Sequence, residues 1–90
     1  MTSALVLGAA GGVGRAIVAR LATGGTHVVA VDQDPTVRQL PGVHAVLVGD
    51  ATEPAVIGRA FDAAPEAPTV LVHALLHELR APLGELTAPQ

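Results

Sequence analysis

The stretch from Leu5 to Val18 constrains the fold of this chain more than any other. A short apolar run leads into four closely spaced glycines, and an amphipathic pattern follows them without a break. Glycine lets a backbone turn sharply and come close to a ligand, because it has no Cβ. The order predicts a strand, a tight turn and a helix. The free N–H groups and the positive dipole end of such a helix favour an anion, so the stretch indicates a phosphate-binding turn.

The glycines satisfy two spacings, G-x-x-x-G-x-G and G-x-x-G-x-x-G, both starting at Gly8. They do not satisfy G-x-G-x-x-G, because Ala10 stands at its middle position. A glycine pattern alone is also compatible with an ordinary turn. Here a predicted strand precedes it and a predicted helix follows, which is the context that phosphate binding requires. The residues expected to bind the cofactor in this turn are Gly8, Gly11, Gly12, Val13 and Gly14.

Four apolar runs, rich in β-branched residues, punctuate the chain: Ala4–Leu7, His27–Val31, Val43–Val48 and Thr69–His73. They are nearly continuous rather than alternating, as expected for strands that are covered on both faces. Segments with helical character separate them, and this alternation predicts right-handed crossovers and a parallel sheet. We expect an α/β, Rossmann-like fold with three α/β/α layers. Its sheet would hold about four strands in the order 3-2-1-4, an incomplete doubly wound arrangement.

Local features predict where the helices begin and which faces they bury. Val13, Ile17 and Leu21 lie at helical spacing and form one apolar stripe of the first helix. Asp34 stands before a proline, which predicts an N-cap and a short helical turn. Thr52 is expected to cap the third helix.

Asp32 ends the second predicted strand. A carboxylate at this place can accept hydrogen bonds from the ribose of adenosine, and it repels a 2′-phosphate. A solvent-facing turn residue or a cap is the alternative interpretation. With the glycine turn before it, Asp32 favours NAD over NADP. NADP stays possible because Arg15 and Arg38 could weaken that preference, although Arg15 is expected to be solvated on the first helix.

Asp50 and Ala51 close the third strand. A carboxylate and a backbone N–H side by side suit the amino group and a ring nitrogen of adenine. We therefore expect this pair to contact the base. Helix capping by Asp50 or Thr52 is the competing interpretation.

Composition argues against several other classes of protein. The 90-residue chain has a formal net charge of −3, and its scattered cations are unsuited to a nucleic-acid backbone. No cysteine is available for a disulfide or a thiolate metal site. His73 and His77 are four apart, but His73 is expected to end a strand, so no metal site is predicted. The chain also has no uninterrupted run of the roughly 20 apolar residues that a membrane span needs. We expect one cytoplasmic domain over residues 1–90, with no membrane partner.

Together these features resemble the short-chain dehydrogenase/reductase family over nearly the whole chain. The glycine turn, the acid after the second strand and the Asp50–Thr52 segment look like that family's cofactor contacts. Val70–Ala74 looks like its fourth strand, which would place His73 and Ala74 beside the nicotinamide end. The segment Ala81–Thr87 is similar to the stretch that introduces the family's next long helix. The resemblance implies the NAD(P)-binding portion of an oxidoreductase.

The family's catalytic residues are missing. Its members use a Tyr-x-x-x-Lys pair and a Ser, in which the Tyr is the general acid and base. This chain has no Tyr and no Lys, and its one Ser is Ser3 near the N-terminus. We therefore assign no catalytic residue and expect an isolated chain of this sequence to be catalytically incomplete.

A second resemblance points to a different class. Val31–Pro35 and Gly49–Thr52 are also similar to the nucleotide-sensing domains that regulate potassium transport, which bind without catalysis. Those domains usually carry G-x-G-x-x-G, which Ala10 interrupts, and they lack a tail like Leu83–Thr87. The dehydrogenase family is therefore the expected assignment. In either case the fourth strand would lie at an open edge of the sheet, and such an edge is a template for self-association.

Overall fold

The four apolar segments pair into one parallel sheet with the order β3-β2-β1-β4. The computed structural model describes residues 2–74. Its strands are β1 (Ser3–Leu7), β2 (His27–Asp32), β3 (Ala45–Val48) and β4 (Val70–His73). Strands β1 and β2 lie in the middle and are almost fully buried, which explains their unbroken apolar sequences. The predicted fold class and strand order are confirmed.

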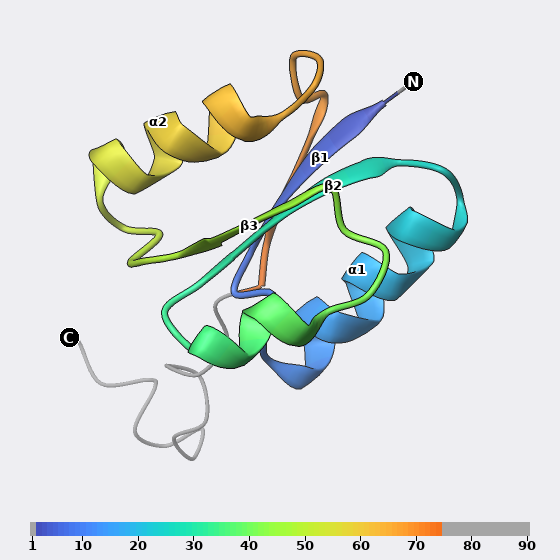
Figure 1. Cartoon of the computed structure of the whole chain (residues 1–90), viewed down its shortest axis with the longest axis horizontal. Coiled ribbons are helices and arrows are strands. Elements are labelled where there is room, and N and C mark those ends of the chain that lie inside the picture. The colour runs from blue at the N-terminus through green and yellow to red at the C-terminus, as the bar shows by residue number, and fades with distance from the viewer. Residues whose placement is uncertain (1, 75–90) are drawn as a thin grey trace, which may run out of the picture.

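Helices cover both faces of the sheet (Figure 1). Helix α1 (Gly12–Thr23) and the 3₁₀ helix η1 (Pro35–Gln39) lie on one face, and α2 (Pro54–Ala63) lies on the other. Successive residues of a strand point to opposite faces, so the core divides into two apolar clusters. The cluster under α2 contains Leu5, Leu7, Val29, Val31, Val56 and Ala60. The cluster under α1 and η1 contains Val6, Val18, Val28, Ala30 and Val37.

The predicted apolar stripe of α1 packs against the core at Ile17 and Leu21 but not at Val13. Val18 is buried and Ile17 is partly buried, but Val13 is 50% exposed. Val13 lies in the first turn of the helix, where Gly14 rather than Val13 faces the protein. The stripe was therefore predicted wrongly at its first member, and Val13 presents its side chain to solvent beside the glycine turn.

The two later helices begin differently from each other. The Oδ1 of Asp34 accepts a hydrogen bond of 2.9 Å from the Thr36 N–H, so the predicted cap of η1 is confirmed. Thr52 does not cap α2, because Glu53 is the N-cap residue and makes no side-chain cap bond. Instead, Thr52 donates both its N–H and its hydroxyl to Asp50, at 2.9 and 2.6 Å.

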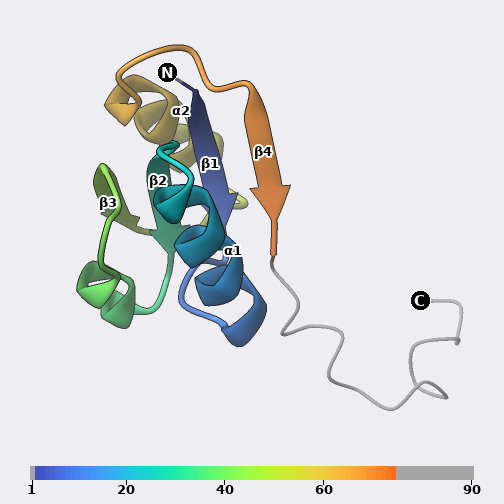
Figure 2. The ribbon, with the colours of Figure 1, turned by 90° about the vertical axis from the view of Figure 1, so that its right-hand side faces the viewer.

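Strand β4 forms one edge of the sheet (Figure 2). It pairs with β1 in a register that sets Leu71 beside Leu5, and within residues 2–74 no strand pairs with its other side. Leu71 is 60% exposed and Val70 is 37% exposed, so this edge strand is apolar and open. His77 and the segment Ala81–Thr87, on which part of the sequence analysis depended, lie outside the described residues.

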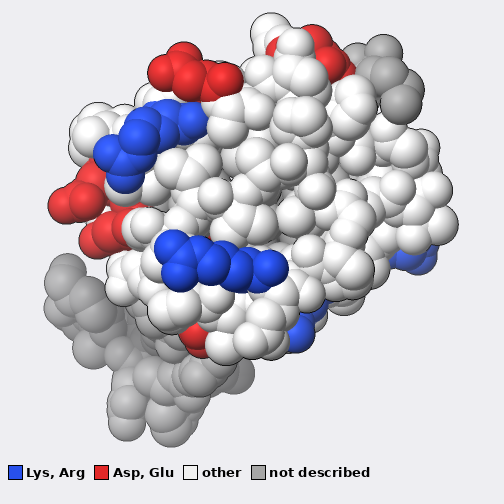
Figure 3. All heavy atoms as spheres, in the orientation of Figure 1, with Lys and Arg blue, Asp and Glu red and all other residues white. Residues whose placement is uncertain are grey.

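Charged side chains are spread over the surface. On the face shown in Figure 3, basic side chains are separated from one another, and acidic ones lie among them. Within residues 2–74, none of the helices is both long enough and apolar enough to cross a membrane.

Candidate functional site

The backbone that follows each strand gathers at the carboxyl edge of the sheet. The N–H groups of Gly8 and Ala9 donate to the Val31 carbonyl, at 2.8 and 3.1 Å, which joins the turn after β1 to the end of β2. The Gly49 N–H donates to the Asp32 carbonyl at 2.9 Å, which joins β3 to β2. Hydrogen bonds between neighbouring strand ends therefore build this edge into one surface.

Helix α1 sits directly on the glycine turn. Gly8 has a φ of +81°, in the left-handed region that side chains disfavour. A Cβ on Gly14 would lie only 2.1 Å from the Gly8 carbonyl oxygen, which is far closer than a side chain allows. Gly8 thus provides the turn, and Gly14 allows the close approach of the helix to it.

The N-terminus of α1 has no side-chain cap. Gly11 is the N-cap residue, and the first turn contains no acidic residue. Apart from its chain neighbours and the backbone of its own helix, a Cβ on Gly12 would meet no atom of residues 2–74 within 4 Å, so the space beside Gly12 is open in this part of the chain. The first-turn N–H groups and the positive dipole end therefore face an open surface, which is the arrangement that binds phosphates at helix N-termini.

The Asp32 carboxylate is fixed toward the glycine turn. Its Oδ2 accepts a hydrogen bond of 2.9 Å from the Ala10 N–H, and its Oδ1 accepts one of 2.9 Å from the Asp34 N–H. A carboxylate oxygen has two lone pairs, so each oxygen can still accept from a hydroxyl group. The two bonds from backbone N–H groups orient the Asp32 side chain at the end of β2, and both of its oxygens can still accept further hydrogen bonds.

Ala10 and Arg15 also belong to this site. Neither is among the predicted cofactor contacts, although Arg15 was named as a residue that could weaken the preference for NAD. Arg15 is exposed, as expected, but its side chain folds back, and its Nε donates to the Ala10 carbonyl at 2.9 Å. The Ala10 peptide unit is therefore held on both sides, by Asp32 at its N–H and by Arg15 at its carbonyl. Both contacts involve backbone atoms of Ala10, which leave no trace in a sequence pattern.

Asp50 and Ala51 lie beyond Asp32, at the end of β3. The Thr52 hydroxyl and then the Thr52 N–H, both donating to the Asp50 carboxylate, hold the pKa of this group below its ordinary value of 3.8. Ala51 is buried in the cluster under α2. Helix capping was the alternative to base contact for Asp50. The Asp50 side chain does bond to backbone, but it forms an Asx-type turn before α2 and is not the N-cap residue.

His73 and Ala74 lie on the other side of the glycine turn. The Ala74 N–H donates to the Leu7 carbonyl at 2.8 Å, and the His73 side chain is exposed at the end of β4. The residues predicted from the sequence therefore follow the carboxyl edge from β3 to β4. In the described part of the chain, no group of three His, Asp or Glu side chains is arranged to hold a metal ion.

A glycine turn after the central strand, a helix N-terminus above it and an acid after the neighbouring strand define a Rossmann-like nucleotide-binding domain. The family model for the TrkA-N domain matches residues 4–74. The chain therefore belongs to the TrkA-N domain family. TrkA-N domains are Rossmann-like domains of potassium-transport regulators and bind the dinucleotide NAD(H).

Among solved structures, the TT0495 protein from Thermus thermophilus is similar, with a TM-score of 0.72 and 32% sequence identity. The match covers 97% of this chain and 39% of that one, so this chain spans well under half the length of its structural relative. A comparison with curated proteins found no match.

The family match corrects the assignment to the short-chain dehydrogenase/reductases and to oxidoreductases, which is wrong. The glycine turn and the acid after β2 are features of dinucleotide-binding domains in general, so they do not separate the two classes. Ala10 was counted against the potassium-transport regulators. Its φ is not positive and its methyl group packs against the cluster under α1, so this turn does not require a glycine there.

Proposed function

We propose that this chain is a nucleotide-binding regulatory module, which binds an adenine dinucleotide and performs no chemistry on it. The observation that carries the proposal is the uncapped N-terminus of α1, held on the glycine turn and facing open space. Membership of the TrkA-N family supports it, since these domains bind NAD(H). In such a module, regulation depends on whether the dinucleotide is bound, because the ligand is not converted.

The order of groups along the carboxyl edge matches the order of groups in the ligand. The pyrophosphate would lie against the first turn of α1, because its N–H groups have no capping side chain. The adenosine ribose would lie at the Asp32 carboxylate, with adenine beyond it and nicotinamide on the opposite side. The residues proposed to contact the ligand are Gly8, Gly11, Gly12, Val13, Gly14, Asp32, Asp50, Ala51, His73 and Ala74.

We propose NAD(H) as the preferred ligand over NADP(H). The carboxylate of Asp32 would accept hydrogen bonds from the free ribose hydroxyls, whereas a 2′-phosphate there would meet a like charge. We further propose that residues 1–90 act as one domain and that the chain works in the cytoplasm, where these dinucleotides are abundant.

Calorimetric titration tests this function directly. The full chain is expected to bind NAD and NADH, and to bind AMP more weakly, since AMP lacks the second phosphate and the nicotinamide nucleoside. Asp32→Ala should weaken NAD binding about tenfold or more, because hydrogen bonds to a charged acceptor are lost. Asp62→Ala, on an exposed position of α2, is the matched control and should leave the affinity unchanged.

Two results would contradict the proposal. One is a lack of heat and of any shift in the thermal unfolding midpoint with millimolar NAD and NADH. The other is turnover: steady oxidation of NADH by the pure chain in the presence of simple carbonyl compounds would show catalysis rather than sensing.

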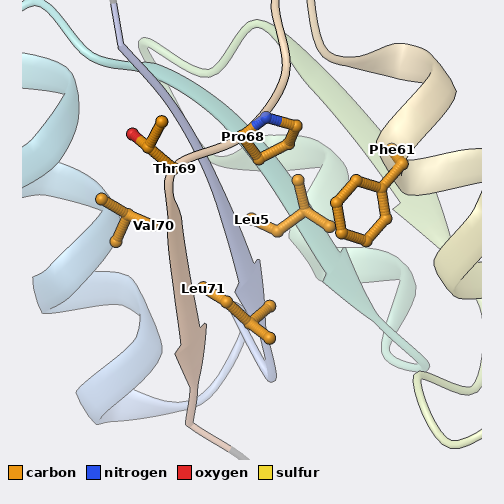
Figure 4. A pocket seen from close by; sticks show the side chains of 6 residues that line it. All are labelled: Leu5, Phe61, Pro68, Thr69, Val70 and Leu71. Carbon is orange, nitrogen blue, oxygen red and sulfur yellow. The ribbon is translucent and has the colours of Figure 1, made fainter.

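We also propose that the chain associates with a second copy of itself through the edge of β4. This strand has no charged residue, and the exposed side chains of Val70 and Leu71 lie on opposite faces of it (Figure 4). Its outer backbone groups form no pairs within the described sheet, and a strand edge of this kind is complementary to itself.

Light scattering of the full chain is expected to show dimers or larger species. Leu71→Lys places a charge on the edge and should shift them toward monomer. Ala19→Lys, on an exposed position of α1, is the control and should not. A monomer that persists at high concentration would contradict self-association, and it would leave nucleotide binding untouched.

A further inference from the structure

The strongest feature that the proposed function does not use is the side chain of Arg15. This residue lies in the first turn of α1, just after Gly14, and belongs to none of the expected ligand contacts. Its guanidinium does not extend into solvent along the helix. It folds back over the glycine turn, and its Nε donates to the Ala10 carbonyl at 2.9 Å.

Arg15 and the acidic group at the end of β2 both bond to the same residue, Ala10. The same Ala10 whose carbonyl accepts from Arg15 donates its N–H to the Asp32 carboxylate, also at 2.9 Å. The backbone N–H of Asp34 donates to the Asp32 carboxylate at 2.9 Å, and the Asp34 carboxylate itself accepts from the Thr36 N–H. One cation and two carboxylates therefore belong to the residues around the end of β2, where the adenosine ribose would lie.

The bond to Ala10 uses only one of the donors of the guanidinium. An arginine has five N–H donors in a rigid fork, so the terminal amino groups of Arg15 stay available to an oxyanion. With Arg15 in place, the nearest charges sum to one negative unit rather than two, and a 2′-phosphate meets less repulsion.

We propose that Arg15 is a specificity-determining residue that admits a 2′-phosphate to the adenosine end of the site. The inference rests on the proposed function, because it assumes that the ribose lies at Asp32. The site would then prefer NAD(H) through Asp32 but retain measurable affinity for NADP(H) through Arg15. The chain would respond to both dinucleotides, with a discrimination that Arg15 keeps small.

The test compares ligands that differ only in the 2′-phosphate. NAD is titrated against NADP, and AMP against adenosine 2′,5′-bisphosphate, with the full chain. Arg15→Ala should weaken binding of the phosphorylated member of each pair about tenfold, the effect of one nearby charge in a partly solvated site. Binding of NAD and AMP, which lack the 2′-phosphate, should weaken several-fold less than binding of NADP and the bisphosphate. The loss should shrink as salt is added, because exposed charges are screened.

Two further variants separate the charge from other effects of the side chain. Arg15→Lys keeps the charge and should recover most of the NADP affinity, although it lacks the planar fork. Arg20→Ala removes an exposed cation from the last turn of the same helix and should have no effect. Far-ultraviolet circular dichroism checks that each variant is folded.

The possible results separate a failure of the Arg15 proposal from a failure of the proposed nucleotide-binding function. Equal losses for NAD and NADP in Arg15→Ala would make Arg15 a support of the turn only and would overturn the specificity proposal. Unchanged NADP affinity in that variant would overturn it as well. If the unmodified chain bound neither dinucleotide, the proposed function itself would fail.

Discussion

Replacement of Gly14 by alanine is the sharpest test of how the glycine turn is built. The added Cβ would lie 2.1 Å from the Gly8 carbonyl oxygen and 2.8 Å from the Ala9 Cα, both backbone atoms. Neither can rotate away. To reach the 3.0 Å that real Cβ atoms respect, helix and turn must separate by about 0.9 Å, the difference between 3.0 and 2.1 Å.

That separation can be converted into a rough free energy. A gap of about 0.5–1 Å forfeits a quarter to a half of the dispersion energy of the atoms that face it. The buried side of α1 is Val18, with Ile17 and Leu21 partly buried, and full burial of such side chains contributes about 1.5–3 kcal/mol each. With strain in the turn added, Gly14→Ala should lower the free energy of unfolding by about 3 kcal/mol. A chain of this size has about 5–13 kcal/mol in all.

Gly12→Ala is the matched control, since a Cβ at that position meets no atom of the described residues within 4 Å beyond its chain neighbours and its own helix backbone. Alanine is the better helix former by up to about 1 kcal/mol, so the stability should hold or rise. The new methyl group would stand in the open space before the helix, and we expect NAD affinity to fall about tenfold. We therefore expect Gly14→Ala to affect the fold and Gly12→Ala to affect ligand binding.

Urea unfolding followed by far-ultraviolet circular dichroism measures the first effect and calorimetry the second. The chain has no Trp and no Tyr, so intrinsic fluorescence is not a useful probe. Equal urea midpoints for Gly14→Ala and the unmodified chain would refute the packing argument. A Gly12→Ala variant that bound NAD with full affinity would refute the assignment of the open space to the pyrophosphate.

Two further predictions concern the core and the opposite edge of the sheet. Val18→Ala should lower the free energy of unfolding by about 2 kcal/mol in the same urea assay, because Val18 is 1% exposed and its methyl groups leave a void; an unchanged midpoint would contradict this. At the amino edge, the hydrogen bond with His27, whose Nδ1 lies 3.0 Å from Oε1, holds the pKa of Glu66 below its ordinary value of 4.5. A lowered pKa means that the charged carboxylate stabilises the fold above pH 4.5 and that this contribution disappears as the pH falls through the folded pKa. Glu66→Gln should therefore be less stable than the unmodified chain near neutral pH, with the difference in melting temperature vanishing in acid. A difference that stayed constant from neutral to strongly acidic pH would contradict this prediction.

The sequence predicted the sheet because local pattern and global topology agree in this chain. Strands buried on both faces must be continuously apolar, and β1 and β2 are. Given four such strands separated by helical segments, handed crossovers leave few possible orders, and 3-2-1-4 is the one observed. Glycines and prolines fixed most boundaries to within two residues. The buried face of α1 was harder to predict. It depends on the close approach of Gly14 to Gly8, which is possible only because Gly14 has no side chain.

The site was predicted only as far as side chains specify it. Asp32 was identified because a carboxylate after a strand is visible in a sequence. Its bond to the Ala10 N–H and the return of Arg15 to the Ala10 carbonyl were not, because one partner in each is backbone. The choice between Asp50 as a base contact and Asp50 as a turn former also depended on the Thr52 hydroxyl, whose direction the order of residues does not determine.

Ala10 shows why glycine spacing separated the two candidate families so poorly. A glycine is required where φ is positive or where a Cβ would collide, and in this turn those positions are Gly8 and Gly14. Position 10 needs only a backbone N–H for Asp32 and a small side chain that fits the cluster under α1. An alanine meets both needs, so its presence says nothing about the class of protein. The spacing of glycines shows where the backbone needs a positive φ or has no room for a Cβ. Whether a domain reacts with its dinucleotide or only senses it depends on side chains outside this turn, so glycine spacing cannot decide between the two families.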